Sequence, residues 1–179
     1  RREANPLAGR GAVNRKFAQA VVKESKTRNP IVLVQDYHFA LLPKMIRDEL
    51  PDATIISFWH IPWPNPESFA ICPWREEILA GMLGSSIMGF HTQFHCNNFV
   101  DTVDRFLEAR VDRESFDVSF GSKMTAVRRY PISIEWPPEP ALLQKSVPEC
   151  RSEIRSRNGL PQEHKLGIGV DRLDYTKGI

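Results

Sequence analysis

The most regular feature of the chain is a series of short apolar runs that alternate with segments of helical periodicity. The runs predict four strands, at 31–35, 53–60, 85–91 and 126–134. Apolar residues three or four positions apart predict four helices, at 12–26, 42–50, 74–83 and about 93–106. The uninterrupted run IVLVQ (31–35) is typical of a strand that is buried on both faces, as in parallel sheets. The alternation therefore predicts an α/β fold, a doubly wound, Rossmann-like parallel sheet flanked by helices.

The composition changes near residue 135, where a proline-rich and acidic stretch begins. Such a stretch is typical of a domain boundary. We therefore expect part of an N-terminal Rossmann-like domain at 1–137, a linker and helix at 138–164, and the start of a second Rossmann-like domain at 165–179. The helix is expected to end at Asn158–Gly159, and KLGIGV (165–170) to form a strand. Because the chain lacks an initial methionine and stops in a charged turn, we interpret it as a fragment.

Charge and cysteine content exclude some classes of protein. Hydrophobic residues make up 41% of the chain and the formal net charge is only +2. The charge gives no global indication of a nucleic-acid or anionic-membrane partner. No apolar run approaches the length of a membrane span. The three cysteines are too few and too widely spaced for a disulfide framework, which favours a reducing compartment, and we expect a cytoplasmic location.

Polar residues follow several of the predicted strands, where open α/β sheets bind ligands. Asp36 follows 31–35, His60 ends 53–60, His91 ends 85–91 and Arg172 follows 165–170. Each has a structural alternative. Asp36 could cap the next helix, and His60 could be a buried histidine bonded to a backbone carbonyl.

Three neighbouring features have structural interpretations too. His38 is expected to orient its loop. The pair Trp59 and Trp63 is interpreted as core or as an interdomain surface, and aromatic rings beside a polar crevice would also suit the faces of sugars. His91 and His95 have a spacing that could hold a metal, but no carboxylate or second cysteine completes such a site beside Cys96, so we expect no metal.

The segment GVDRLDYTKGI (169–179) predicts an anion site. Arg172 offers a bidentate fork to phosphate oxygens and Lys177 a flexible point charge, so together they could neutralise a diphosphate without a metal. The alternative is a surface ion-pair cluster with Asp171 and Asp174. The chain has neither a P-loop nor a dinucleotide fingerprint.

Five blocks of the sequence, collinear from about residue 13 to the end, carry a resemblance to a known family. The blocks are VQDYHFALLP (34–43), FWHIPWPNPESF (58–69), GFHTQ (89–93), RRYPISIE (128–135) and GVDRLDYTKGI (169–179). They resemble the trehalose-6-phosphate synthase family, the retaining glycosyltransferases of family 20 with the GT-B fold. Residues 1–12 match the family poorly.

The resemblance implies a role for each matched residue. Asp36 would hydrogen-bond the acceptor, glucose 6-phosphate. His60 would contact the donor glucose as the catalytic residue, with Ile61 as a wall of the sugar site. Arg172 and Lys177 would bind the diphosphate of UDP-glucose.

The resemblance also implies the reaction, which is transfer of glucose from UDP-glucose to glucose 6-phosphate with retention. It implies no cofactor, no metal and no protein nucleophile. The expected partners are the two small-molecule substrates, with a homo-oligomer possible. A sister enzyme with another phosphorylated acceptor, such as glucosylglycerol-phosphate synthase, and a non-catalytic sugar-phosphate sensor stay as alternatives. We expect the 179 residues alone to have no transferase activity.

Overall fold

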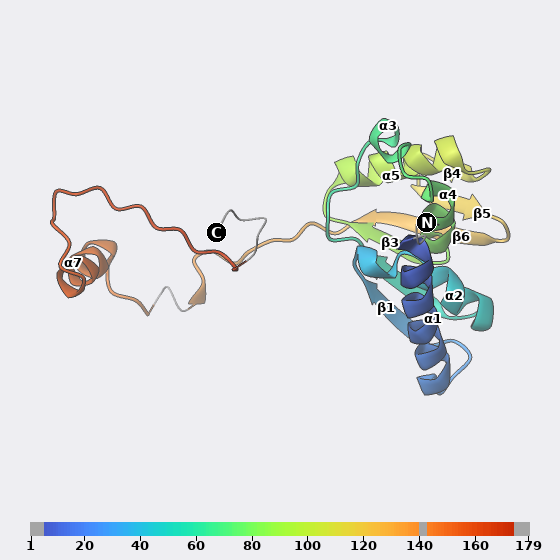
Figure 1. Cartoon of the computed structure of the whole chain (residues 1–179), viewed down its shortest axis with the longest axis horizontal. Coiled ribbons are helices and arrows are strands. Elements are labelled where there is room, and N and C mark those ends of the chain that lie inside the picture. The colour runs from blue at the N-terminus through green and yellow to red at the C-terminus, as the bar shows by residue number, and fades with distance from the viewer. Residues whose placement is uncertain (1–5, 140–142, 174–179) are drawn as a thin grey trace, which may run out of the picture. The chain divides into compact units, whose positions relative to one another are not determined.

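The computed structural model describes residues 6–139 and 143–173 (Figure 1). The chain divides into two compact units, the first ending at Ile132 and the second beginning at Ser133. The boundaries that we expected at 137 and 164 stay predictions, because compactness alone assigns neither unit to a functional domain. None of the helices in the described part of the chain combines the length and apolar character that a bilayer crossing requires.

The first unit builds a sheet from strands β1 to β6. Its elements are, in chain order, α1 (Pro6–Glu24), β1 (Ile31–Gln35), the 3₁₀ turn η1 (Tyr37–Phe39), α2 (Leu42–Glu49), β2 (Thr54–Phe58), α3 (Pro66–Phe69), α4 (Arg75–Met82), β3 (Ile87–Phe90), α5 (Gln93–Phe106), β4 (Arg110–Asp112), β5 (Asp117–Phe120) and β6 (Lys123–Arg129). The strand order is β1-β2-β3-β6-β5-β4. Strands β1, β2, β3 and β6 are parallel, whereas β4 and β5 run antiparallel to their neighbours. The predicted α/β fold is confirmed, but the sheet is mixed rather than wholly parallel.

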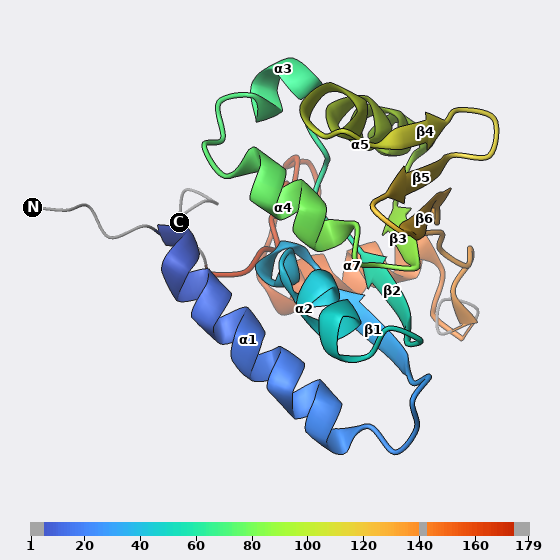
Figure 2. The same ribbon diagram turned by 90° about the vertical axis from the view of Figure 1, so that its right-hand side faces the viewer.

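Helices α1, α2, α4 and α5 lie on one face of the sheet (Figure 2). Val34, Ile55 and Met88 point into the two apolar clusters under these helices. On the opposite face of β1, the exposed fraction is 74% for Ile31 and 67% for Leu33. The prediction that 31–35 is buried on both faces is therefore wrong. The chain passes from β1 to β2, β3 and β6 always in the same direction, so right-handed crossovers put every connecting helix on the same side. The sheet of this unit is accordingly singly wound rather than doubly wound.

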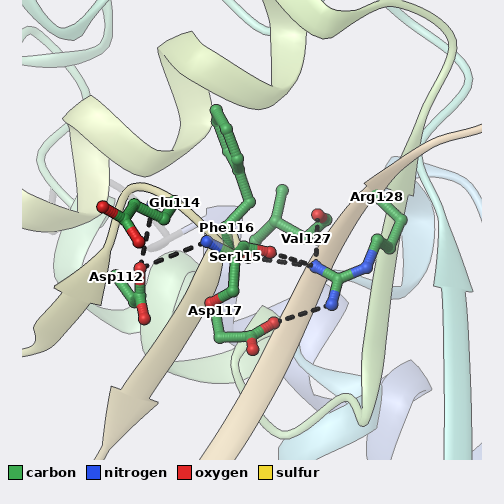
Figure 3. Close-up of polar contacts among 7 residues, drawn as sticks. All are labelled: Asp112, Glu114, Ser115, Phe116, Asp117, Val127 and Arg128. Carbon is green, nitrogen blue, oxygen red and sulfur yellow. Dashed lines mark hydrogen bonds and ion pairs between the residues drawn. The ribbon is translucent and has the colours of Figure 1, made fainter.

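The hairpin of β4 and β5 was not predicted, and a single arginine fixes its turn to β6 (Figure 3). Arg128 on β6 donates one hydrogen bond to the carbonyl of Ser115 at 2.8 Å and one to the carboxylate of Asp117 at 2.9 Å. Asp112 accepts hydrogen bonds from the backbone N–H groups of Glu114 and Ser115, and these bonds hold the pKa of its carboxyl below the ordinary value. Phe116 has a positive φ of 57° within this turn. The short polar turn forms because these side chains satisfy its backbone.

Most predicted elements are confirmed, with shifted ends. The helix predicted at 12–26 begins earlier, at Pro6, and the strand predicted at 126–134 spans 123–129. This strand ends before Pro131, which has no N–H to donate to a neighbouring strand. Thr92 caps α5 by accepting a hydrogen bond from the backbone N–H of His95.

The second unit contains helix α7 (Val147–Arg157). A capping box at Ser146 starts it, and Asn158 ends it as predicted, followed by Gly159 with φ of 62°. The strand expected at 165–170 is not formed, and Leu166, Ile168 and Val170 are all exposed. A strand needs a neighbour for its backbone groups, and no other strand lies in the described residues of this unit.

Candidate functional site

The carboxyl ends of β1, β2 and β3 lie next to one another at one edge of the sheet. The backbone N–H of Asp36 donates to the carbonyl of Phe58 at 2.8 Å, and that of Trp59 donates to the carbonyl of Gly89 at 2.9 Å. The chain segments leaving these parallel strands therefore start at the same level. The structure thus brings three predicted residues, Asp36, His60 and His91, to the same edge.

Asp36 has an unusual backbone conformation at the end of β1. Its φ is 69° and its ψ is 172°, a region that glycine populates and other residues rarely do. Its carboxylate accepts a hydrogen bond from the backbone N–H of Tyr37 at 2.8 Å, so it caps η1. The capping alternative therefore holds for the short turn η1 but not for the helix predicted at 42–50, whose N-cap Leu41 makes no side-chain cap hydrogen bond. One hydrogen bond leaves the carboxylate with further acceptor capacity, so capping is compatible with ligand binding.

His60 lies two residues beyond β2 and is exposed. Its Nε2 lies 2.7 Å from the side-chain oxygen Oε1 of Gln35 on β1. The alternative of a buried histidine bonded to a backbone carbonyl is therefore wrong. The imidazole is exposed at this edge of the sheet, and its hydrogen bond to a neutral amide restricts its rotation. Its other nitrogen can still contact a ligand.

The loop after β2 is anchored by tryptophans. Trp63 is 1% exposed and Trp59 is 8% exposed, so both belong to the core, which was the first of the interpretations. Trp63 donates from Nε1 to the hydroxyl of Thr102 on α5 at 3.1 Å, and its carbonyl accepts from Asn98 at 3.1 Å. Asn65 then caps α3 by accepting a hydrogen bond from the backbone N–H of Ser68. His60 thus stands at the start of a loop whose far end is fixed in the core.

Ile61 borders a pocket of about 190 Å³ at this edge. Tyr37, Trp59 and Phe69 contribute aromatic walls, and Arg10 on α1 is the one cationic residue among those lining it. Sequence reasoning missed Tyr37 and Arg10. Tyr37 directly follows the Asp36 that was singled out, but Arg10 lies in a segment whose sequence gave no signal.

The predicted anion site is only partly within the described residues. Arg172 is exposed in the second unit, and its backbone N–H donates to the carboxylate of Asp171 at 2.8 Å. Lys177 and Asp174, which the sequence prediction included, lie outside the described residues. Among residues 6–139 and 143–173, no group of three or more His, Cys, Asp or Glu side chains could hold a metal.

Comparison with known sequences identifies the family of this chain. The sequence pattern of glycosyltransferase family 20 matches residues 8–179. The chain belongs to glycosyltransferase family 20. The trehalose-6-phosphate synthase of Mycobacterium sp. (strain JLS) is 40% identical to this chain over 175 residues. The alignment covers 93% of this chain and 36% of that protein, so the chain spans about a third of the length of this family 20 relative.

The fold of this chain is also similar to that of solved structures. A UDP-forming α,α-trehalose-phosphate synthase from Burkholderia xenovorans is similar with a TM-score of 0.76 and 29% identity, over 99% of this chain and 39% of that chain. The N-terminal domain of trehalose-6-phosphate phosphatase from Candida albicans is similar with a TM-score of 0.70 and 26% identity, over 84% of this chain and 32% of that chain. The family 20 fold therefore also occurs in a protein named as a phosphatase.

Proposed function

We propose that the complete gene product carrying this sequence is a retaining glycosyltransferase that transfers glucose from UDP-glucose to glucose 6-phosphate, giving trehalose 6-phosphate and UDP. The observation that carries the proposal is the alignment of Asp36 and His60 at adjacent strand ends, in a chain that belongs to family 20. The mycobacterial relative named above is called a trehalose-6-phosphate synthase, which supports the choice of reaction.

Within this proposal, the described residues of the first unit orient the sugars. Asp36 accepts hydrogen bonds from hydroxyls of the acceptor, and His60 contacts the donor glucose beside the reacting carbon. Ile61 forms an apolar wall of the sugar site and limits where the acceptor ring can lie. Holding both sugars in a reactive orientation lowers the barrier without any protein nucleophile.

The cations of the second unit act on the leaving group. The bond between the anomeric carbon and the phosphate oxygen breaks, and the acceptor hydroxyl forms a new bond on the same face. The hydroxyl proton passes to the departing phosphate oxygen. Arg172 and Lys177 neutralise the charge that develops on UDP, which stabilises the transition state more than the ground state. The proposed reaction needs neither a cofactor nor a metal, and we place it in the cytoplasm.

The test measures UDP release by the complete gene product with UDP-glucose and one of two acceptors. We expect turnover with glucose 6-phosphate, and a fall of about a hundredfold in kcat for His60→Ala. His164→Ala is the matched control, because the described contact of His164 is made by its backbone carbonyl. Turnover with glycerol 3-phosphate alone would favour the sister enzyme. No turnover with either acceptor would favour the non-catalytic sensor.

A second variant tests the cations. Arg172→Ala should raise the KM for UDP-glucose and slow turnover, because the guanidinium contacts the diphosphate in both the ground and the transition state. Unchanged kinetics in this variant would contradict the assignment of Arg172 to the diphosphate. The roles proposed for Asp36 and His60 would not be affected.

A further inference from the structure

A group of aromatic side chains and one glycine lies beside His60, and none of the roles above uses it. We call the group, which consists of Phe58, Gly89, His91 and Tyr130, the aromatic seat. Phe58 ends β2 and Gly89 lies next to it on β3, with which it is in register. His91 directly follows β3, and Tyr130 directly follows β6.

The ring of Phe58 packs edge-to-face against two imidazoles. Its centroid lies 4.8 Å from that of His60 at an interplanar angle of 74°, and 4.8 Å from that of His91 at 87°. The two imidazole centroids are 6.0 Å apart. These distances and angles are the ones that aromatic pairs favour. Together with the hydrogen bond to Gln35, they hold the His60 ring from two directions.

Gly89 makes this packing possible because it has no side chain. A Cβ atom at this position would lie 2.8 Å from the ring of Tyr130 and 2.9 Å from the ring of Phe58, closer than real Cβ atoms approach. Any larger residue at 89 would therefore displace Phe58 or Tyr130, and a displaced Phe58 would move His60. The glycine here serves a close approach of rings, not an unusual backbone angle.

His91 is held by packing rather than by hydrogen bonding at its inner nitrogen. Its Nδ1 is buried and has no hydrogen-bond partner among the described residues. Buried polar atoms are usually paired, so the absence of a partner means that Nδ1 does not hold this ring in place. The ring instead packs against Phe58, at the edge of the sheet on which Asp36 and His60 lie.

We propose that the aromatic seat is a positioning device that fixes the orientation of His60 toward the donor sugar. Oε1 of Gln35 can only accept, so Nε2 of His60 carries the proton in that contact. The seat then leaves Nδ1 of the neutral ring as an acceptor for a sugar hydroxyl. The inference rests on the proposed role of His60, and its first test is independent of any activity.

The first test is NMR of the His60 ring protons in the 179-residue chain. The edge-to-face contact with Phe58 shifts these protons by ring current, and Phe58→Leu should abolish the shift while keeping apolar bulk. Gly89→Ala should change the shift. Gly9→Ala on α1 should not, because an added Cβ at that position would meet nothing within 4 Å. If Gly89→Ala does not fold, Phe58→Leu still decides. Identical His60 signals in Phe58→Leu and the parent chain would overturn the proposal.

His91 variants separate ring packing from nitrogen chemistry. His91→Phe keeps a ring against Phe58 and should retain the His60 shift, whereas His91→Ala should lose part of it. Loss of the shift in both variants to the same extent would show that the His91 ring does not position His60 by packing, and would exclude His91 from the seat.

The second test is steady-state kinetics of the complete gene product. Phe58→Leu should lower kcat/KM for UDP-glucose about tenfold and leave the KM for glucose 6-phosphate within about twofold, because only the donor-facing group is misplaced. Unchanged kcat/KM with altered His60 signals would show that the seat does not serve catalysis. Absence of turnover in the unsubstituted protein, with the NMR result as expected, would defeat the proposed function and leave the packing role intact.

Discussion

Two segments of this chain were expected to carry ligand-binding residues, and they differ in how the fold supports them. The loop 59–65 holds His60 and sends Trp63 into the core, where its exposed fraction is 1%. The segment 165–173 holds Arg172, and its apolar residues Ile168 and Val170 are 89% and 88% exposed. Both segments lie within residues 8–179, which match the sequence pattern of family 20.

The difference shows that a sequence motif identifies a residue, whereas the packing around the motif fixes where that residue lies. The loop has α5 to receive its side chains and hydrogen-bonding groups, so its path is fixed within the first unit. The apolar run at 165–170 has no strand beside it among the described residues, so no neighbouring strand covers its apolar side chains. Four predictions test this contrast, in order of decreasing effect, with the two that concern Cys96 taken together.

The largest effect is expected for Trp63→Ala. Truncation removes a fully buried ring and its hydrogen bond to Thr102, so the free energy of unfolding should fall by about 3–5 kcal/mol. Urea unfolding followed by far-UV circular dichroism measures it. The matched control is Trp136→Ala in the second unit, where the ring is 79% exposed and the change should stay within about 0.5 kcal/mol. Equal effects of the two substitutions would remove the contrast.

The next effect concerns thiol reactivity. Cys96 lies in the same core as Trp63, and burial raises the pKa of its thiol from 9.0 to about 11. At pH 8 this lowers the thiolate fraction about a hundredfold, so the native chain should react with a disulfide reagent about a hundred times more slowly at Cys96 than the urea-unfolded chain does. Cys72 and Cys150 are half-buried and should both be labelled before Cys96. Fast labelling of Cys96 in the native chain would contradict the packing described for the loop.

The raised pKa of Cys96 also fixes the sign of a pH effect. The folded chain favours the protonated thiol, so the contribution to stability is fully present below pH 9 and is lost as the pH rises toward 11. Cys96→Ala should remove that pH dependence from the stability of the first unit.

The smallest effect is expected for Asn65→Ala at the end of the loop. The side chain of Asn65 caps α3, and loss of the cap should cost about 1 kcal/mol. Asn65→Ser keeps an acceptor and is the matched control, expected within a few tenths of a kcal/mol of the parent. A cost of several kcal/mol would mean that the loop depends on its cap more than on Trp63.

Strand and helix positions were predictable where burial and periodicity agree. The runs at 31–35 and 53–60 contain β1 and β2, and the helix predicted at about 93–106 is α5, with Phe99 and Val103 on its buried side. The hairpin of β4 and β5 was missed because its short strands alternate charged and apolar residues without a long run. Its turn depends on Arg128, which is distant in sequence from most of the carbonyls it binds.

The exposed face of β1 was not predictable from its own residues. The run Ile31–Gln35 has the same apolar content whether one face or two are covered, and only the strand order decides. For the candidate site, the placement of Asp36 and His60 at one edge followed from the sequence. The contact of His60 with Gln35 and the packing of Phe58 on Gly89 did not, because side-chain contacts between strands depend on register.

The backbone of Asp36 has a consequence for engineering. At φ of 69° and ψ of 172°, glycine would fit with less strain, and strain of this kind costs of order 1–3 kcal/mol. Asp36→Gly would relieve this strain, but it would also remove the hydrogen bond to the backbone N–H of Tyr37 and the carboxylate proposed to hold the acceptor. A stability screen on this scaffold therefore needs a binding screen run in parallel, because one substitution bears on both properties.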